Sequence, residues 1–222
     1  MLQAAGKRQL QHAKRRLWEC LPSLRRDAKI ARMSFPVQYN ERFDAQGKLD
    51  ADAWLLVPRA ALPAGFTLDT ALADEMARCF FETVTRHSPL PLRMADQSQS
   101  VRLLAPLGKT ALVLADAERI VDAARAETSW RIAGGFVLAH GVNYGGRFYL
   151  GAEWQADGAC KLYSTVRRFP PRLVAYFSLA RGIALYRRTQ GATLRRLQER
   201  YLQAVVAMLT AAPCSRRDVN RP

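Results

Sequence analysis

The sequence is poor in the residues that most often hold metals or form disulfides. It has four cysteines and three histidines in 222 residues, and no two cysteines form a CxxC pair. The three histidines, His12, His87 and His140, show none of the HxH, HxxxH or HExxH spacings of metal sites. These absences exclude a zinc ribbon and a thioredoxin-type motif, and we expect reduced thiols, no metal ligands and no cofactor.

Long apolar runs are also missing. The longest, such as residues 111–115 and 134–139, are far shorter than the roughly 20 residues that a membrane helix needs. The first 32 residues carry nine lysines and arginines and no uninterrupted apolar stretch, which is unlike a secretory signal. We therefore expect no membrane span and a cytoplasmic location.

Acidic residues are scarce compared with basic ones. The chain has 34 Lys and Arg against 19 Asp and Glu, which gives a net charge of +15. The excess lies at the two ends, since residues 1–32 and 151–222 are strongly basic while residues 33–100 are slightly acidic. Arginine supplies most of the cations, and its planar group binds phosphate bidentately and stacks on bases. This distribution predicts contact with a polyanion.

The first half of the chain mixes helices and strands. Asp69 or Thr67 can cap a helix over residues 70–87, where Leu72, Met76, Phe80 and Val84 form one apolar stripe. The segment 110–127 is ambiguous, because residues 111–114 suit a strand while residues 115–126 have a helical pattern. The other elements that we expect here are a basic amphipathic helix over 3–19, an extended segment over 30–43 and strands over 53–58 and 101–105.

The second half predicts a meander followed by helices. Strand patterns cover residues 130–139, 147–155 and 160–168, and Asp157-Gly158 is a strong signal for a short hairpin between the last two. After a double proline, helical patterns cover residues 173–188 and 192–211, with a break or kink near Gly191.

These elements predict an α+β fold, in which an antiparallel sheet with a C-terminal three-strand meander is flanked by helices and followed by a long C-terminal helical segment. We expect one domain over residues 1–212, with a weak possible subdivision near 95–100. Residues 213–222 are expected to form a basic flexible tail.

The arginines are the best candidates for a binding surface. Those of the C-terminal helices lie opposite the apolar stripe, and aromatic residues among them could stack on bases. The bland alternative is that they are the solvated face of ordinary amphipathic helices. The residues predicted to bind nucleic acid are Arg8, Arg15, Arg16, Arg147, Arg167, Arg168, Arg172, Arg188, Arg195, Arg196 and Arg200.

Two short segments could carry chemistry. The glycine-rich loop 140–147 contains His140 and Tyr144, which could serve a metal-independent ribonuclease as acid–base groups. The alternative, which we prefer, is a hairpin connection with incidental polar residues. Asp50 and Asp52 form a DxD pair that could hold magnesium, although solvated acids are common in a polar loop such as 44–52.

The charge distribution leads to a nucleic-acid-binding protein as the main hypothesis. RNA is favoured over DNA, because no DNA-reading module is evident, and the chain would be a subunit of a ribonucleoprotein or mobile-element complex. One alternative is a helix-grip domain that binds a small molecule or lipid. A cavity lined by Phe136, Leu138, Phe148, Leu150, Trp154 and Leu162 would favour it. Another is a structural subunit that docks acidic protein partners.

Overall fold

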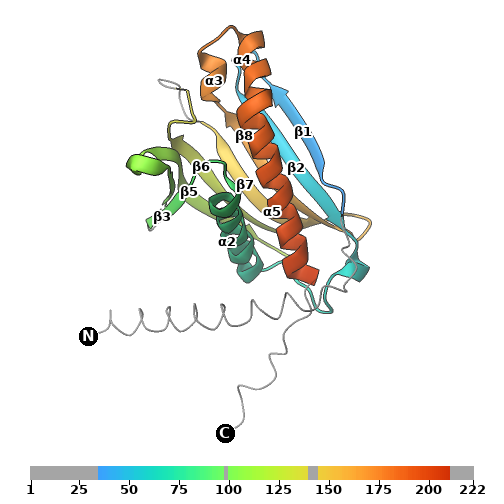
Figure 1. Cartoon of the computed structure of the whole chain (residues 1–222). Helices are drawn as coiled ribbons and strands as arrows, with labels where there is room; N and C mark the ends of the chain where they lie inside the picture. The colour runs from blue at the N-terminus through green and yellow to red at the C-terminus, as the bar shows by residue number, and fades with distance from the viewer. Residues whose placement is uncertain (1–34, 98–99, 140–144, 211–222) are drawn as a thin grey trace, which may run out of the picture. The chain divides into compact units, whose positions relative to one another are not determined.

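A computed structural model describes residues 35–97, 100–139 and 145–210, which are drawn in colour in Figure 1. The helix expected over residues 3–19 lies outside the described residues, as do Arg8, Arg15, Arg16, His140, Tyr144 and the tail from residue 213. The described residues from Phe35 onward belong to one compact unit.

An antiparallel sheet of eight strands is the main element of this unit. Its strands lie in the order β1-β2-β8-β7-β6-β5-β4-β3. The sheet confirms the predicted α+β class. The expected three-strand meander is not confirmed as such, because six consecutive strands, β3 to β8, neighbour one another. The strands are β1 (Gln38–Phe43), β2 (Leu49–Val57), β3 (Arg93–Gln97), β4 (Ser100–Leu104), β5 (Thr110–Val121), β6 (Arg125–Gly134), β7 (Arg147–Trp154) and β8 (Cys160–Phe169).

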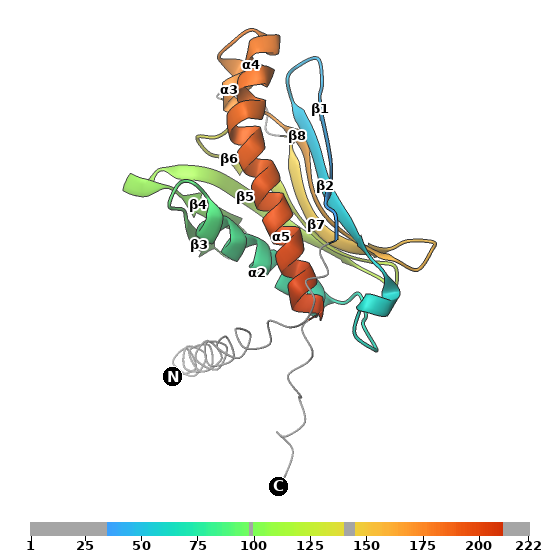
Figure 2. The ribbon, with the colours of Figure 1, turned by 45° about the vertical axis from the view of Figure 1, so that its right-hand side comes forward.

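Two helices, α2 (Thr70–His87) and α5 (Ala192–Thr210), lie side by side against one face of the sheet (Figure 2). The predicted cap of α2 is formed by Asp69, whose Oδ1 accepts a hydrogen bond of 2.8 Å from the backbone N–H of Leu72. The other helical segments are η2 (Arg59–Ala61), η3 (Pro106–Gly108), α3 (Arg172–Ala175), α4 (Leu179–Tyr186) and η4 (Arg187–Gly191).

The helices cover an apolar sheet face that follows from alternation along the strands. In β2, residues 49, 51, 53, 55 and 57 are buried, and Asp50, Asp52 and Trp54 point to the other face. On the covered face, Phe80 of α2 packs against Phe148 of β7 with ring centroids 4.7 Å apart. The buried Gln198 of α5 donates hydrogen bonds of 3.0 and 3.2 Å to the carbonyl and hydroxyl oxygens of Ser164 in β8.

The helical interpretation of residues 115–126 is wrong, because β5 continues to Val121. Pairing with β6 is interrupted between Ala115 and Glu118, and Asp116 has a φ of 52° at this bulge. After β5 the Asp122 carboxylate accepts the backbone N–H groups of Ala124 and Arg125, which closes the hairpin to β6. Tertiary pairing therefore overrides the local helical pattern.

The break expected near Gly191 is a local change in winding. The segment Arg187–Gly191 forms a π-helical turn, η4, between α4 and α5. Gly191 lies so close to Tyr186 that an added Cβ would stand 2.8 Å from its ring. The close packing of this ring on Gly191 accounts for the glycine at this position.

The packing of α3 against the turn between β1 and β2 can be tested with two glycine variants. Gly47 has a φ of 75°, and a Cβ added there would lie 2.6 Å from the Val174 side chain of α3. Gly65 has a similar φ of 78° with nothing within 4 Å. We expect Gly65→Ala to cost about 1 kcal/mol through backbone strain alone. Gly47→Ala should cost about 2–3 kcal/mol, since the Val174 and Leu179 side chains must also move. Urea unfolding measures both; equal losses would show that α3 does not hold this turn.

Candidate functional site

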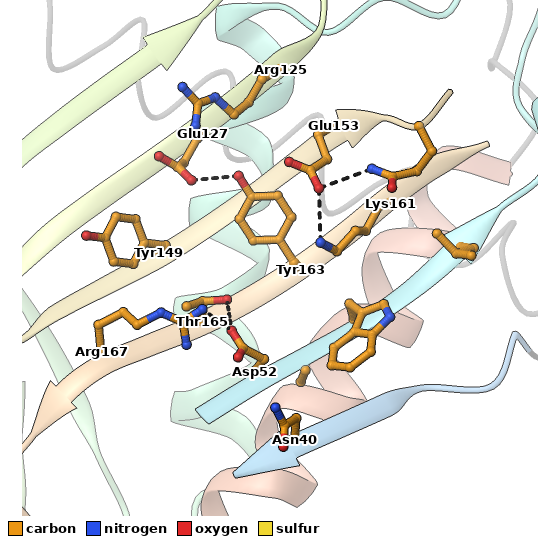
Figure 3. Close-up of a pocket in the computed structure, with 14 residues that line it drawn as sticks. Asn40, Asp52, Arg125, Glu127, Tyr149, Glu153, Lys161, Tyr163, Thr165 and Arg167 are labelled. Atoms are coloured by element: carbon orange, nitrogen blue, oxygen red, sulfur yellow. Dashed lines mark hydrogen bonds and ion pairs between the residues drawn. The ribbon is translucent and has the colours of Figure 1, made fainter. Parts of the chain in front are cut away.

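A groove of about 630 Å³ lies on the sheet face that the helices leave uncovered. Figure 3 shows its side chains in front of the strands, with the helices behind. Five strands contribute residues to it, so no single segment of the sequence contains the site. The lining residues are Asn40, Asp52, Ala53, Trp54, Leu56, Arg125, Glu127, Tyr149, Glu153, Gln155, Lys161, Tyr163, Thr165 and Arg167.

The strand register arranges the groove residues in rows across the sheet. The central row runs from Trp54 of β2 through Tyr163 of β8 and Gly151 of β7 to Glu127 of β6. On one side of it, Lys161, Glu153 and Arg125 pair in the same way, and on the other side Asp52, Thr165 and Tyr149 do. Directly opposed residues on one face have Cβ atoms about 4.5–5.5 Å apart, so the side chains of a row lie within reach of one another.

Tyr163 crosses over a glycine to reach Glu127. A Cβ added to Gly151 would lie 2.5 Å from the Tyr163 ring, so only glycine leaves room for the ring at this point. The Tyr163 hydroxyl donates a hydrogen bond of 2.6 Å to Oε2 of Glu127. Both residues are buried, with exposed fractions of 8% and 7%. Burial raises the pKa of Tyr163, and the hydrogen bond to Glu127 raises it further, so the hydroxyl stays protonated.

Two ion pairs flank this row. Nζ of Lys161 lies 3.0 Å from the carboxylate of Glu153. On the other side, Arg167 lies 2.7 Å from Oδ1 of Asp52, and the Thr165 hydroxyl donates to the same oxygen at 2.9 Å. Asp52 therefore has cationic and neutral donors at once, while Asp50 is bound by Arg42 and by the backbone N–H of Arg168. The two aspartates of the DxD pair lie in β2, not in a polar loop, and both are engaged with protein donors.

Two arginines of the groove have guanidinium groups that the described residues do not fully engage. Arg131, Arg147 and Arg167 are directly opposed on β6, β7 and β8. Like charges so placed repel, and each arginine has an acidic partner: Asp116, Glu118 and Asp52, respectively. However, Nη1 of Arg167 is buried and has no hydrogen-bond partner among the described residues. The half-buried Arg125 likewise forms no ion pair with them.

The predicted arginines are divided among separate surfaces. Arg167 lines the groove, and Arg147 is its neighbour on the outer sheet face. On α5, Arg195 lies over the ring of Tyr39 in β1, while Arg200 lies 2.7 Å from Nδ1 of His87 at the end of α2. Figure 2 shows β1 and α2 on opposite sides of α5. The others are exposed or half-buried: Arg168 at the end of β8, Arg172 in α3, Arg188 in η4 and Arg196 in α5.

The sequence argument missed most groove residues, although a weak signal was present. In β6 and β8 polar or aromatic residues stand at every second position, as in Arg125, Glu127, Ser129 and Arg131, and β7 follows the same pattern except at Gly151. Such alternation indicates which residues share a face, but not which of them meet across strands. The register supplies this second piece of information.

The comparisons with known proteins concern the fold. No protein-family model matches the sequence, and no curated protein matches it. Among solved structures, the chain is similar to the human StAR-related lipid transfer protein 5, with 12% identity, coverage of 89% of this chain and 97% of that chain, and a TM-score of 0.43. Human STARD10 gives 9% identity, 84% and 78% coverage, and a TM-score of 0.41. Protein Ms6760 from Mycobacterium smegmatis gives 11% identity, 79% and 99% coverage, and a TM-score of 0.39.

The prediction of a nucleic-acid-binding protein with RNA as its partner is wrong. The eight-stranded antiparallel sheet with its long C-terminal helix agrees with the helix-grip alternative instead. The physical reason for the error is that charge was summed along the sequence. In the fold, the arginines lie on both faces of the sheet and on opposite sides of α5, and several are neutralised by acids. The ribonuclease was an extension of this hypothesis, and the roles suggested for His140 and Tyr144, which lie outside the described residues, stay predictions.

The bond between Tyr163 and Glu127 gives a second test. Tyr163→Phe leaves a buried carboxylate without this donor, which should lower the free energy of unfolding by about 1–3 kcal/mol. Tyr149→Phe is the matched control, because the Tyr149 hydroxyl lies in the same groove without a hydrogen bond to a described residue. Its effect should stay within about 0.5 kcal/mol. Urea unfolding at neutral pH compares the two variants, and equal losses would contradict the role given to the bond.

Proposed function

We propose that this chain is a small-molecule-binding domain of the helix-grip kind, whose ligand lies in the groove on the outer sheet face. The observation that carries the proposal is that arginine donors of this groove lack an acceptor among the described residues. A buried donor without a partner is rare in folded proteins, and Nη1 of Arg167 has no partner in the part of the chain that the structure describes. A ligand that accepts a hydrogen bond there would remove the penalty of this group.

The groove has the size and the mixed lining of a ligand site. Its volume of about 630 Å³ falls within the range of roughly 300–1,000 Å³ that is usual for small-molecule pockets. Trp54, Tyr149 and Tyr163 offer ring surfaces, and Thr165 offers a hydroxyl next to Arg167. An apolar body with one polar end suits this combination.

The charges favour an anionic group on the ligand. Glu153 and Asp52 already have cationic partners, and Glu127 is bound by Tyr163. Among the described lining residues, Arg125 and Nη1 of Arg167 are the cationic groups that no acid or acceptor engages, so a carboxylate, sulfonate or phosphate would complete the groove. Acidic protein partners, the third hypothesis, are not favoured, since acids line the groove as well as cations.

The space between the sheet and the helices is not the proposed site. Of the six residues expected to line an internal cavity, Leu138, Phe148, Leu150 and Leu162 are buried in the core, and Phe136 and Trp154 pack against it. Rings of α2, β6, β7 and α5 pack together in this space, where Trp130 and Phe81 meet edge to face with centroids 5.6 Å apart. No helix among the described residues is long and apolar enough to cross a membrane. The cytoplasmic location stays a prediction.

The proposal is tested with a panel of aromatic and aliphatic carboxylates, sulfonates and phosphates, each paired with an uncharged amide or ester. Intrinsic tryptophan fluorescence during heating identifies the compounds that stabilise the full chain. Calorimetric titration then measures their affinity. We expect at least one anion to bind with a Kd below about 1 mM. Its uncharged counterpart should bind about tenfold more weakly.

A matched pair of variants locates the binding. Arg125→Gln removes a groove cation that forms no ion pair with a described residue, and it should weaken binding of the anion about tenfold, as expected for one charge-assisted hydrogen bond. Arg102→Gln is the control, since Arg102 is exposed on β4 outside the groove. If no anion of the panel binds, or if both variants bind as the unaltered chain does, the proposal is overturned.

A further inference from the structure

We infer that the segment Ala175–Arg181 docks this protein on a lipid surface that contains anionic lipids. This segment, called the tip below, joins α3 to α4 and lies with them at one end of the described unit (Figure 1). All seven of its residues are exposed, and most of them are apolar. Tyr176, Phe177 and Leu179 keep 57%, 51% and 42% of their surface in contact with solvent.

Tertiary contacts hold the tip in this exposed position. Arg172 donates hydrogen bonds to the Tyr176 hydroxyl at 2.8 and 3.0 Å and to the carbonyl of Phe136 at 3.2 Å. Gly182 lets α4 approach α3 closely, because a Cβ at this position would stand 2.7 Å from Cα of Val174. The apolar side chains are therefore presented by a packed structure, and an exposed apolar patch of this kind marks a contact surface.

An apolar cleft continues this surface. A cleft of about 340 Å³ separates the turn between β1 and β2 from the start of α3 and α4. Phe177 and Leu179 of the tip belong to its lining, together with Pro170, Pro171 and Val174. The apolar surface at this end is thus larger than the exposed side chains alone.

The charges around the tip point to an anionic lipid surface. The sequence has no Asp or Glu from Gly158 to Gln198. Arg172, Arg181 and Arg188 form no ion pair with a described residue, so their charges are not neutralised within the fold. Aromatic and aliphatic side chains bordered by arginine are typical of proteins that insert shallowly between lipid headgroups.

A second copy of the chain fits this end less well. In a two-fold symmetric dimer the same patch lies on both subunits, so the unpaired arginines around one tip would face those around the other. Repulsion between these like charges disfavours such a dimer. A surface of anionic lipids supplies the complementary charge and accepts the apolar side chains at the same time.

Vesicle co-sedimentation of the full chain tests the inference. The probes are vesicles of phosphatidylcholine with and without phosphatidylglycerol. We expect binding to the anionic vesicles and at least tenfold weaker binding to phosphatidylcholine alone. Phe177→Ser combined with Leu179→Ser should lower the partition coefficient on anionic vesicles at least tenfold. The control is Leu90→Ser combined with Leu107→Ser, which removes two exposed leucines outside the tip and should leave binding unchanged.

A second measurement reports insertion directly. In the variant Phe177→Trp the added fluorescence should shift to shorter wavelength on anionic vesicles and be quenched by brominated lipid chains. Equal binding of the tip variant and the control, or an added tryptophan that stays in water on bound vesicles, overturns the inference. If the chain does not bind vesicles but dimerises with rising concentration, and the tip variant abolishes this dimerisation, the tip is an interface with a second copy of the chain. These experiments test the tip, whereas the anion panel tests the groove. Either the inference or the proposed function can therefore be overturned without the other.

Discussion

One face of the eight-stranded sheet is apolar and has to be removed from water, and the other features of the molecule follow from how this is done. Leu55, Leu150 and Leu162 on neighbouring strands are fully or almost fully buried on that face, beneath α2 and α5. The buried Nε2 of Gln198 donates to the carbonyl and hydroxyl oxygens of Ser164, which helps to hold α5 over β8. Because strand side chains alternate, assigning one face to the helices assigns every second residue to the opposite face. The groove is built from these residues.

The sequence was sufficient to predict those elements whose formation depends on residues close together along the chain. The hairpin at Asp157-Gly158 formed as predicted, with Gly158 at a φ of 81° and the Asp157 carboxylate accepting the N–H of Ala159. Helix α2 spans the predicted residues, and Asp69 caps it. The prediction for the second half of β5 was wrong, because its alanines and charged residues favour a helix locally, whereas its residues 118–121 pair with β6.

The site was beyond the reach of the sequence for a different reason. Asp52 and Thr165 are bonded to each other, as are Glu127 and Tyr163, although each pair is far apart along the chain. Only the strand register brings them together, and a shift by one residue would turn each of them to the other face. The net charge misled in the same way, since a sum of cations does not show that Arg167 meets Asp52 or that Arg187 meets Glu41.

The π-helical turn at Arg187–Gly191 determines the direction in which α4 points. Such a turn corresponds to one additional residue within an α-helix. A helix advances by about 100° per residue, so without this residue α4 would be rotated by roughly that angle about the axis it shares with α5. Phe177 and Leu179 would then face another direction, while α5 kept its place on the sheet. A single insertion or deletion could thus re-aim one end of this molecule during evolution and leave its core intact.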